Sequence, residues 1–318
     1  MIKLDNKVTQ ILEEVSKVVK GKEEQLKKVL MTILAEGHIL LEDVPGVGKT
    51  TIALAFSKVL GIDFNRIQFT PDVVPSDIIG FTLYDRERGE FVFQEGAVMS
   101  NLILADEINR TSSRTQAALL EAMEEKKVTI DGKTYPLPEP FNVIATQNPI
   151  GSFGTQALPQ SQLDRFMMKI SIGYPDFQSQ VDLLKDRQTA QPLDNVVDVV
   201  TKEQLLQMKE EVKQVHIAEE ILHYITHLTE ATRNHAHIIQ GVSPRGALAL
   251  SRVAKAKAYI DGRTFVTPED VIDLFIETCQ HRIILDQKAQ VKYENDRALL
   301  EEILATIKTP DIQAQALL

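Results

Sequence analysis

The sequence predicts an α/β core built on a mainly parallel sheet, followed by an all-α domain. Short apolar segments alternate with helical patterns in the first half of the chain, an order typical of parallel strands covered by helices on both faces. After about residue 174 the apolar spacing is helical to the end, so we expect two domains, 1–174 and 175–318. The expected strands are residues 39–41, 66–69, 102–105, 141–145 and 168–172.

Helical and hairpin patterns fill the intervals between these strands. The expected helices of the core are residues 7–20, 23–36 and 114–125. Residues 89–96 and 128–135 alternate as hairpins do, with Asp131-Gly132 as a turn signal in the second. In the second domain, Thr201 and Thr267 stand where capping residues begin helices.

The composition is that of an ordinary soluble globular protein. The chain has 318 residues, 43% hydrophobic and 25% charged, which is enough to bury a sizeable core. No apolar run approaches the ~20 residues that span a bilayer, and the N-terminal segment is amphipathic rather than a secretory signal. We therefore expect no transmembrane segment and a cytoplasmic location. The single cysteine, Cys279, excludes an intrachain disulfide, and we expect it to be a small buried side chain.

The charge balance disfavours nucleic acid as a partner. The formal net charge is -10 at pH 7, and no dense cluster of Lys and Arg appears in the sequence. A protein that neutralises many phosphates needs a basic face. We therefore expect no nucleic-acid partner, although local basic loops lining a pore would escape this argument.

A glycine-rich loop between the first strand and the next helix has the spacing of a phosphate-binding loop. The loop runs Pro45-Gly46-Val47-Gly48-Lys49-Thr50-Thr51. Its glycines permit a tight curl that directs backbone N–H groups at phosphate, in front of a helix N-terminus. Lys49 is expected to reach the β- and γ-phosphates, and the Thr50 hydroxyl to ligate Mg²⁺. Asp43 replaces the first glycine of the usual pattern, and we expect its carboxylate to point away from the phosphates.

A second motif places two acids at the end of an apolar strand. The strand at 102–105 leads directly into Asp106 and Glu107, at the edge where open α/β sheets bind their ligands. Asp106 is expected to hold Mg²⁺, directly or through water, and Glu107 to polarise the attacking water. Acids at a strand end are common, but ~55 residues after a phosphate-binding loop they favour ATP hydrolysis.

Three further residues have both a catalytic and a structural interpretation. Asn148 follows the strand at 141–145 and either orients the attacking water or begins a turn before Pro149. Arg165 either reaches the phosphate of a neighbouring subunit or forms a surface ion pair. Arg245 lies in the first turn of a helix, where the dipole disfavours a cation, so we expect an anion beside it; an exposed arginine that bends away is the alternative.

Taken in order, these segments resemble the MoxR family of AAA+ ATPases, which are P-loop NTPases. The matching stretches are LLEDVPGVGKT at 40–50, ADEINR at 105–110, QAALLEAM at 116–123, ATQNP at 145–149, QLDRF at 162–166 and GVSPR at 241–245. They run through both expected domains. The resemblance implies an AAA+ core followed by a helical lid, with ATP and Mg²⁺ bound between core and lid at the interface with the next subunit.

The resemblance also implies roles for single residues. Val19 and Gly21 match the segment that packs against adenine. Asn148 matches the first sensor, Arg165 the arginine finger that acts on a neighbour, and Arg245 the lid sensor. The first expected hairpin matches the insert within helix two, and the second matches the hairpin before the first sensor. Both usually face the pore or the client.

Family members are ring-forming, usually hexameric, chaperone-like motors. They act on partners that carry a von Willebrand factor A domain and help to mature enzymes or to insert metals into them. The resemblance therefore implies an ATP-driven remodelling subunit, by analogy of family. Two alternatives remain: a nucleic-acid-remodelling AAA+ motor, which the acidic charge disfavours, and a scaffold that binds ATP without turnover, which the presence of Glu107, Asn148 and Arg165 disfavours.

Overall fold

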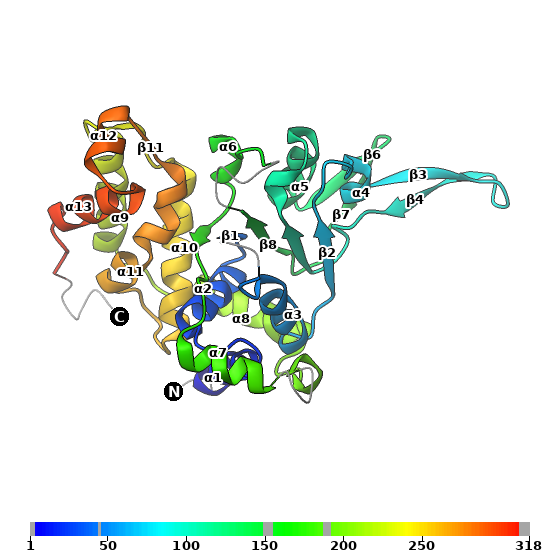
Figure 1. Ribbon diagram of the computed structural model, residues 1–318, viewed down its shortest axis with the longest axis horizontal. Helices are drawn as coiled ribbons and strands as arrows, with labels where there is room; N and C mark the ends of the chain where they lie inside the picture. The colour runs from blue at the N-terminus through cyan, green and yellow to red at the C-terminus, as the bar shows by residue number, and fades with distance from the viewer. Residues whose placement is uncertain (1–3, 44–45, 149–154, 187–191, 312–318) are drawn as a thin grey trace.

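The protein is represented by a computed structural model that describes residues 4–43, 46–148, 155–186 and 192–311. These residues form a sheet-based core with a helical lid beside it (Figure 1). The central sheet has five strands, and every neighbouring pair is parallel. In sheet order the strands are β2 (Phe64–Gln68), β5 (Leu102–Asp106), β8 (Asn142–Gln147), β1 (Ile39–Glu42) and β9 (Met168–Ile170). All five predicted strands are confirmed, with boundaries within two residues.

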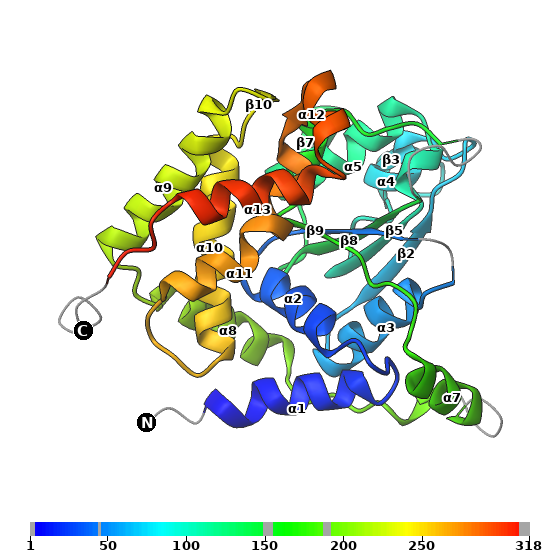
Figure 2. The ribbon, with the colours of Figure 1, turned by 60° about the vertical axis from the view of Figure 1, so that its left-hand side comes forward.

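Helices cover both faces of this sheet, as predicted (Figure 2). Because successive strand side chains point to opposite faces, Ile39 and Leu41 are buried on one side and Leu40 on the other. The first side carries α1 (Leu4–Ser16), α2 (Glu23–Leu34) and α3 (Lys49–Val59). The second side carries α4 (Pro75–Ile79) and α5 (Ser113–Glu125). Helix α1 ends four residues before the predicted boundary, because the chain turns there toward Gly21, which has a φ of +65°.

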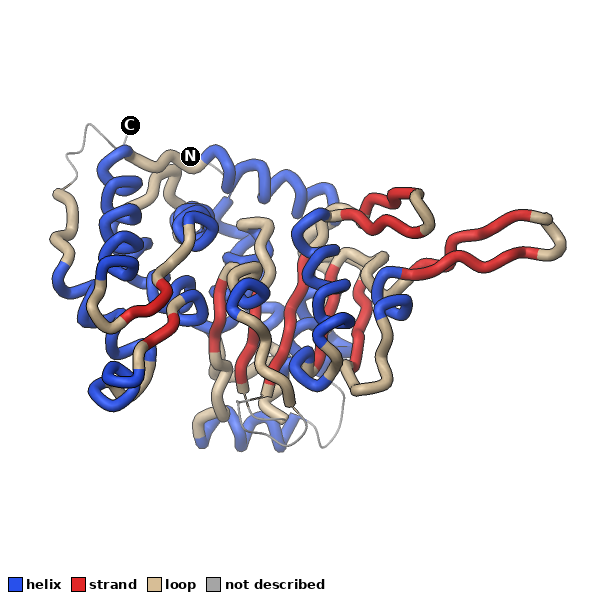
Figure 3. Tube along the Cα trace, turned by 90° about the horizontal axis from the view of Figure 1, so that it is seen from above, coloured by secondary structure: helices blue, strands red, loops and turns tan. Residues whose placement is uncertain are grey.

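Two antiparallel hairpins project from the core (Figure 3). The second, β6 (Lys127–Ile130) with β7 (Lys133–Pro136), lies where the sequence predicts it. The prediction for 89–96 is partly wrong, because that segment supplies only β4 (Glu90–Glu95), whose partner is the earlier β3 (Gly80–Asp85). The turn lies between them, where the Asp85 carboxylate accepts hydrogen bonds from the backbone of Glu87 and Arg88.

The second half of the chain is mainly helical, as predicted. Its helices are α7 (Phe177–Asp186), α8 (Lys202–Gln214), α9 (Glu219–Asn234), α10 (Pro244–Ile260), α11 (Pro268–Cys279), α12 (Gln287–Lys292) and α13 (Asp296–Thr306). Thr201 caps α8 by accepting from the Gln204 N–H, and the Thr267 N–H donates to Asp270 at the start of α11. The all-α expectation overlooks one short antiparallel pair, β10 (Ile238–Gln240) with β11 (Ile284–Leu285).

Shorter elements complete the description. They are α6 (Gln160–Leu163) and the 3-10 turns η1 (Ile108–Arg110), η2 (Pro192–Asn195) and η3 (Gln280–Arg282). Within the described parts of the chain, no helix has the length and apolar character that crossing a membrane requires.

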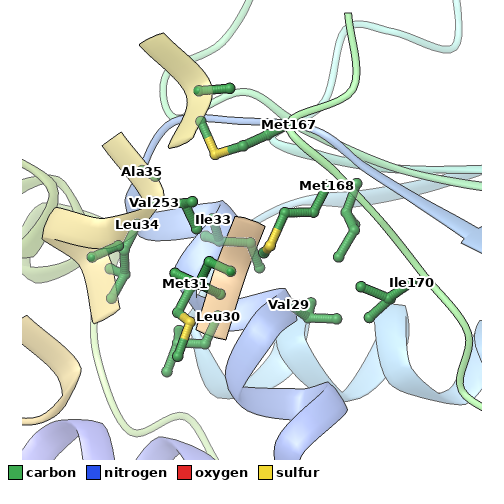
Figure 4. Packing of buried hydrophobic residues seen from close by; sticks show 14 of the residues in the cluster. Val29, Leu30, Met31, Ile33, Leu34, Ala35, Met167, Met168, Ile170 and Val253 are labelled. Atoms are coloured by element: carbon green, nitrogen blue, oxygen red, sulfur yellow. The ribbon is translucent and has the colours of Figure 1, made fainter. Parts of the chain in front are cut away.

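Core and lid share one apolar cluster in which α2 is central. Val29 and Ile33 of α2 lie close to Met168 and Ile170 at the edge strand β9, and Val253 of α10 approaches from the lid (Figure 4). Cys279 is buried in the same cluster, as predicted. Burial of apolar surface contributes about 25 cal/mol per Å², so this shared cluster holds the lid against the core.

Candidate nucleotide site

The phosphate-binding loop leads from β1 into α3, as the sequence predicts. Gly46 and Gly48 have φ values of +89° and +92°, a left-handed conformation that glycine adopts without strain. Gly48 is the N-cap of α3, so Lys49, Thr50 and Thr51 form the first turn of that helix. Pro45, which we also assigned to this loop, lies outside the described residues.

Asp43 supports the loop from behind. Its carboxylate accepts hydrogen bonds from Ser171 Oγ at 2.9 Å, from the Gly173 N–H at 3.2 Å and from the Ile172 N–H. Its backbone carbonyl accepts from Lys49 Nζ at 2.8 Å. The carboxylate therefore points toward the segment after β9, which confirms the predicted direction. Burial lowers the pKa of Lys49, and the charges of Asp43, Asp106 and Glu107 oppose that shift.

Asp106 and Glu107 lie side by side at the carboxyl end of β5, and Thr146 of β8 holds both. The Thr146 hydroxyl donates to Asp106 Oδ1 at 2.7 Å and accepts from the Glu107 N–H at 2.8 Å. Asp106 Oδ2 pairs with Arg66 Nη2 at 2.7 Å. Glu107 has a φ of +59°, which is uncommon for a residue with a side chain and clusters at functional sites.

Three donors hold the Glu107 carboxylate. Gln68 Nε2 and Arg110 Nη1 donate to Oε2 at 3.0 and 2.9 Å, and Asn148 Nδ2 donates to Oε1 at 3.0 Å. Burial alone would raise the pKa of Glu107, but the hydrogen bonds from Arg110 and Asn148 outweigh it and the pKa lies below its usual value. The carboxylate is therefore ionised near neutral pH.

Asn148 is fixed by its backbone and leaves one side-chain atom unused. Asn109 Nδ2 donates to the Asn148 carbonyl at 3.0 Å, and the Asn148 N–H donates to Asn109 Oδ1 at 3.3 Å. The Oδ1 atom of Asn148 is buried and has no hydrogen bond in the described part of the chain. An unsatisfied buried acceptor beside Glu107 suits a bound water, as the catalytic interpretation of Asn148 requires. The turn interpretation involves Pro149, which lies outside the described residues.

A cavity of about 380 Å³ joins these groups, and we call it the P-loop cavity. Its lining consists of Gly46, Gly48, Lys49, Thr50, Thr51, Arg66, Gln68, Asp106, Glu107 and Asn148. A hydroxyl and a carboxylate in one cavity are the hard oxygen donors that Mg²⁺ takes beside phosphate oxygens. Thr50 and Asp106 both line this cavity, so their oxygen donors fit the predicted Mg²⁺ site.

Val19 and Gly21 lie beside this site without lining the cavity. Val19 is buried, and Gly21 lies against Asp176 and Ser179 at the start of α7. A Cβ on Gly21 would lie 2.2 Å from Ser179 Oγ, so only glycine fits there. Lys22 Nζ donates to the Tyr174 carbonyl at 2.7 Å, which connects the loop to the segment that Asp43 also holds.

Arg165 and Arg245 do not reach the P-loop cavity of their own chain. They line a second cavity of about 380 Å³, which we call the arginine cavity, together with Glu124, Lys126 and Arg252. The anion expected beside Arg245 is the carboxylate of Glu124, which pairs with both arginines. The P-loop cavity contains no described lid residue, and the position of ATP between core and lid at the interface with the next subunit stays a prediction.

Sequence reasoning overlooked the polar residues of the neighbouring strands. Arg66 and Gln68 alternate on β2, and the parallel register places Gln68 opposite Asp106. Thr146 lies on β8, one strand further across the sheet. The signal was available, because carboxyl ends of parallel strands meet at one edge. It could have been found by considering which side of each strand the polar residues occupy.

Comparison with known proteins gives similarity along nearly the whole chain. The model of the ATPase family associated with various cellular activities (AAA) matches residues 38–168, and the AAA lid domain matches residues 230–303. The uncharacterized protein YeaC of Bacillus subtilis is 44% identical over 94% of this chain and 93% of its own length. Chaperone MoxR1 of Mycobacterium tuberculosis is 36% identical over 95% of this chain and 82% of its own. A solved structure of a candidate ATPase from Cytophaga hutchinsonii is 40% identical, with a TM-score of 0.89 over 97% of this chain and 96% of that one.

Proposed function

Because the chain belongs to the MoxR family of AAA+ ATPases, we propose that it hydrolyses ATP in the P-loop cavity with Mg²⁺ as the second cofactor. One observation carries this proposal: three separate motifs bring Lys49, the pair Asp106 and Glu107, and Asn148 to one cavity. Phosphoryl transfer needs little covalent chemistry from a protein, only positioning and neutralisation of charge. A phosphate-binding loop facing an ionised carboxylate and an amide supplies both.

Each side chain has a task that its contacts support. Lys49 and the backbone after Gly46 bind the phosphates, as the loop conformation favours. Glu107 accepts a hydrogen bond from the attacking water, and the unused Oδ1 of Asn148 accepts another from the same water. Thr50 and Asp106 hold Mg²⁺, which when bound neutralises charge on the β- and γ-phosphates.

The two arginines complete the site from a neighbouring subunit. A guanidinium that stabilises the transferred phosphoryl group must contact it, and Arg165 and Arg245 instead line a cavity apart from their own Lys49. The proposal therefore includes a homo-oligomer, namely a hexameric ring like those of the MoxR family. Each subunit presents both arginines to the ATP of the next.

The hairpins are proposed to contact partner proteins. The β3–β4 hairpin exposes Phe81, Leu83, Tyr84 and Phe91, each at least 48% accessible. The two hairpins are linked, because Phe93 stacks on Tyr135 with ring centroids 4.0 Å apart and Thr82 donates to Asp131. Hydrolysis would move them together. We propose that this cytoplasmic chaperone remodels partners that carry a von Willebrand factor A domain, in enzyme maturation or metal insertion.

Steady-state ATP hydrolysis across a range of protein concentrations tests the proposal. We expect specific activity to rise with concentration, because the site is completed between subunits, and to vanish in Lys49→Ala. Activity that is independent of concentration down to monomer would remove the arginines from the site. Activity that persists in Lys49→Ala would show that another site hydrolyses ATP.

A further inference from the structure

One carboxylate of the core holds both arginines of the arginine cavity. Glu124, near the end of α5, places Oε2 at 3.1 Å from Arg165 Nε and accepts a hydrogen bond at Oε1 from Arg245 Nη2. Arg165 belongs to the core, just after α6, whereas Arg245 lies in the first turn of α10 in the lid. Glu124 is therefore the point at which a core arginine and a lid arginine are electrostatically joined.

The contact with Arg165 is incomplete. Its Nε atom is buried and makes no hydrogen bond, so Glu124 lies at ion-pair distance without receiving the N–H. Within the described residues, the other guanidinium nitrogens of Arg165 have no hydrogen bond either. Each arginine uses a single carboxylate oxygen, not the bidentate geometry that makes such pairs strong. With 36% of the Glu124 side chain exposed, these pairs are weak enough to exchange for a better anion.

Glu124 is the acid that pairs with these two arginines, because the other acids of the cavity are paired elsewhere. The neighbouring Asp164 is engaged by Ser243 Oγ and Arg282 Nε, each at 2.8 Å, and Glu36 pairs with Lys213 at 3.2 Å. The cations Lys126 and Arg252 also line the cavity. Neither has a side-chain hydrogen bond or ion pair among the described residues. The cavity thus has positive charge in excess and room for a phosphate group.

We propose that Glu124 is a positioning residue that occupies the place of the neighbour's phosphate and releases Arg165 and Arg245 when that phosphate arrives. This inference rests on the proposed function. A γ-phosphate presents more charge and more acceptor oxygens than a carboxylate, so it displaces Glu124 from both guanidinium groups. Because one arginine is in the core and the other in the lid, the exchange connects the neighbour's ATP to the contact between core and lid.

The proposal predicts that Glu124 lowers the affinity for ATP while it orients the arginines. The probe is a fluorescent ATP analogue with Mg²⁺, measured in assembled protein that carries Glu107→Gln to prevent hydrolysis. Glu124→Gln removes the competing charge, and its Kd should fall about fivefold, the size of an exposed ion pair. Glu124→Asp keeps the charge and should stay within about twofold of the parent. Glu220→Gln, the same change at an exposed position of α9, is the matched control.

Turnover separates positioning from a merely structural role. With Glu107 restored, Glu124→Gln should lower KM and keep kcat within about twofold of the parent, because the arginines have already left Glu124 once the phosphate is bound, whereas structural damage would lower kcat. A Kd or KM that is unchanged or higher in Glu124→Gln would overturn the inference. If Glu124→Gln does not fold, weaker ATP binding by a folded Glu124→Asp would overturn it as well. Failure of the parent protein to bind the analogue would instead overturn the proposed function.

Discussion

The P-loop cavity and the arginine cavity have similar volumes but a different charge balance. In the first, two cations, Lys49 and Arg66, share the lining with two carboxylates, those of Asp106 and Glu107. In the second, Glu124 pairs with two arginines, and further cations line the cavity. In our proposal the first cavity binds Mg²⁺ and the phosphates of ATP, and the second presents its arginines to the ATP of the neighbouring subunit.

Two buried lysines show the same difference. Burial lowers the pKa of both, but carboxylates oppose the shift at Lys49. At Lys209 burial lowers the pKa to about 7; the charge of Glu36 opposes this, whereas Lys126 and Lys213 push it further down. Lys209 Nζ donates to Asn142 Oδ1 at 2.8 Å, between α8 and the sheet. At Lys49 the neighbouring charges thus favour the protonated amine, whereas at Lys209 neighbouring lysines oppose it.

The strongest test of the comparison removes Arg165, which the proposal assigns to the ATP of the neighbouring subunit. Arg165→Ala should lower ATP turnover by about 10⁴-fold, within the range known for arginines supplied in trans. ATP binding and folding should be retained, because Arg165 touches no residue of the P-loop cavity. Arg297→Ala, an exposed arginine of α13, serves as the control. Turnover is measured by phosphate release, and binding by a fluorescent ATP analogue.

Rings assembled from two different variants test whether the two cavities meet between subunits. Arg165→Ala subunits keep an intact P-loop, and Lys49→Ala subunits keep an intact arginine. Mixed rings should therefore recover turnover that neither variant has alone. If mixtures stay as inactive as their components, the two cavities do not meet between subunits.

The core was predictable because its signals are local. An apolar run followed by Gly46, Gly48 and Lys49 specifies strand, loop and helix within a dozen residues, and the two acids mark the end of β5. The partner of β4 was missed because the hairpin signal lies in the turn after Asp85, outside the alternating segment. The domain boundary near residue 174 stays a prediction.

The contacts of the two arginines could not be predicted, because they depend on how the lid is placed. Sequence patterns fix the cap of α10 at Ser243, and the structure confirms that cap. They do not specify that the Asp164 carboxylate accepts hydrogen bonds from Ser243 and Arg282. With the lid held in this way, Arg245 lies beside Glu124 and not beside Lys49. That arrangement arises from packing between segments about 80 residues or more apart, which no local pattern encodes.

The pH dependence of unfolding free energy tests the contrast between the pKa values of the two lysines. Lysine has a pKa of about 10.4 in an unfolded chain, whereas that of Lys209 in the fold is about 7. Between these values the unfolded state binds more protons, so the Lys209 contribution to stability increases as pH rises from 7 toward 10. We expect Lys209→Met to reduce the slope of unfolding free energy by about 1.4 kcal/mol per pH unit. Urea unfolding at pH 7.5 and 9.5 measures it.

The control for this series is an exposed lysine. Lys288→Met on α12 changes the same side chain where it is open to solvent, and it should keep the parental slope. A parental slope in Lys209→Met as well would mean that the buried amine is charged throughout, and the contrast with Lys49 would disappear.

The smallest expected effect concerns the acid behind the phosphate-binding loop. Asp43→Asn puts an amide where three donors now meet a carboxylate, and one mismatched buried hydrogen bond should cost about 2 kcal/mol of unfolding free energy. Because the carboxylate points away from the loop, the Kd for ATP should change less than about threefold, or 0.65 kcal/mol. Tightening by tenfold or more would mean that Asp43 repels the phosphates. The P-loop cavity would then carry an additional acid, and its charge would differ even more from that of the arginine cavity.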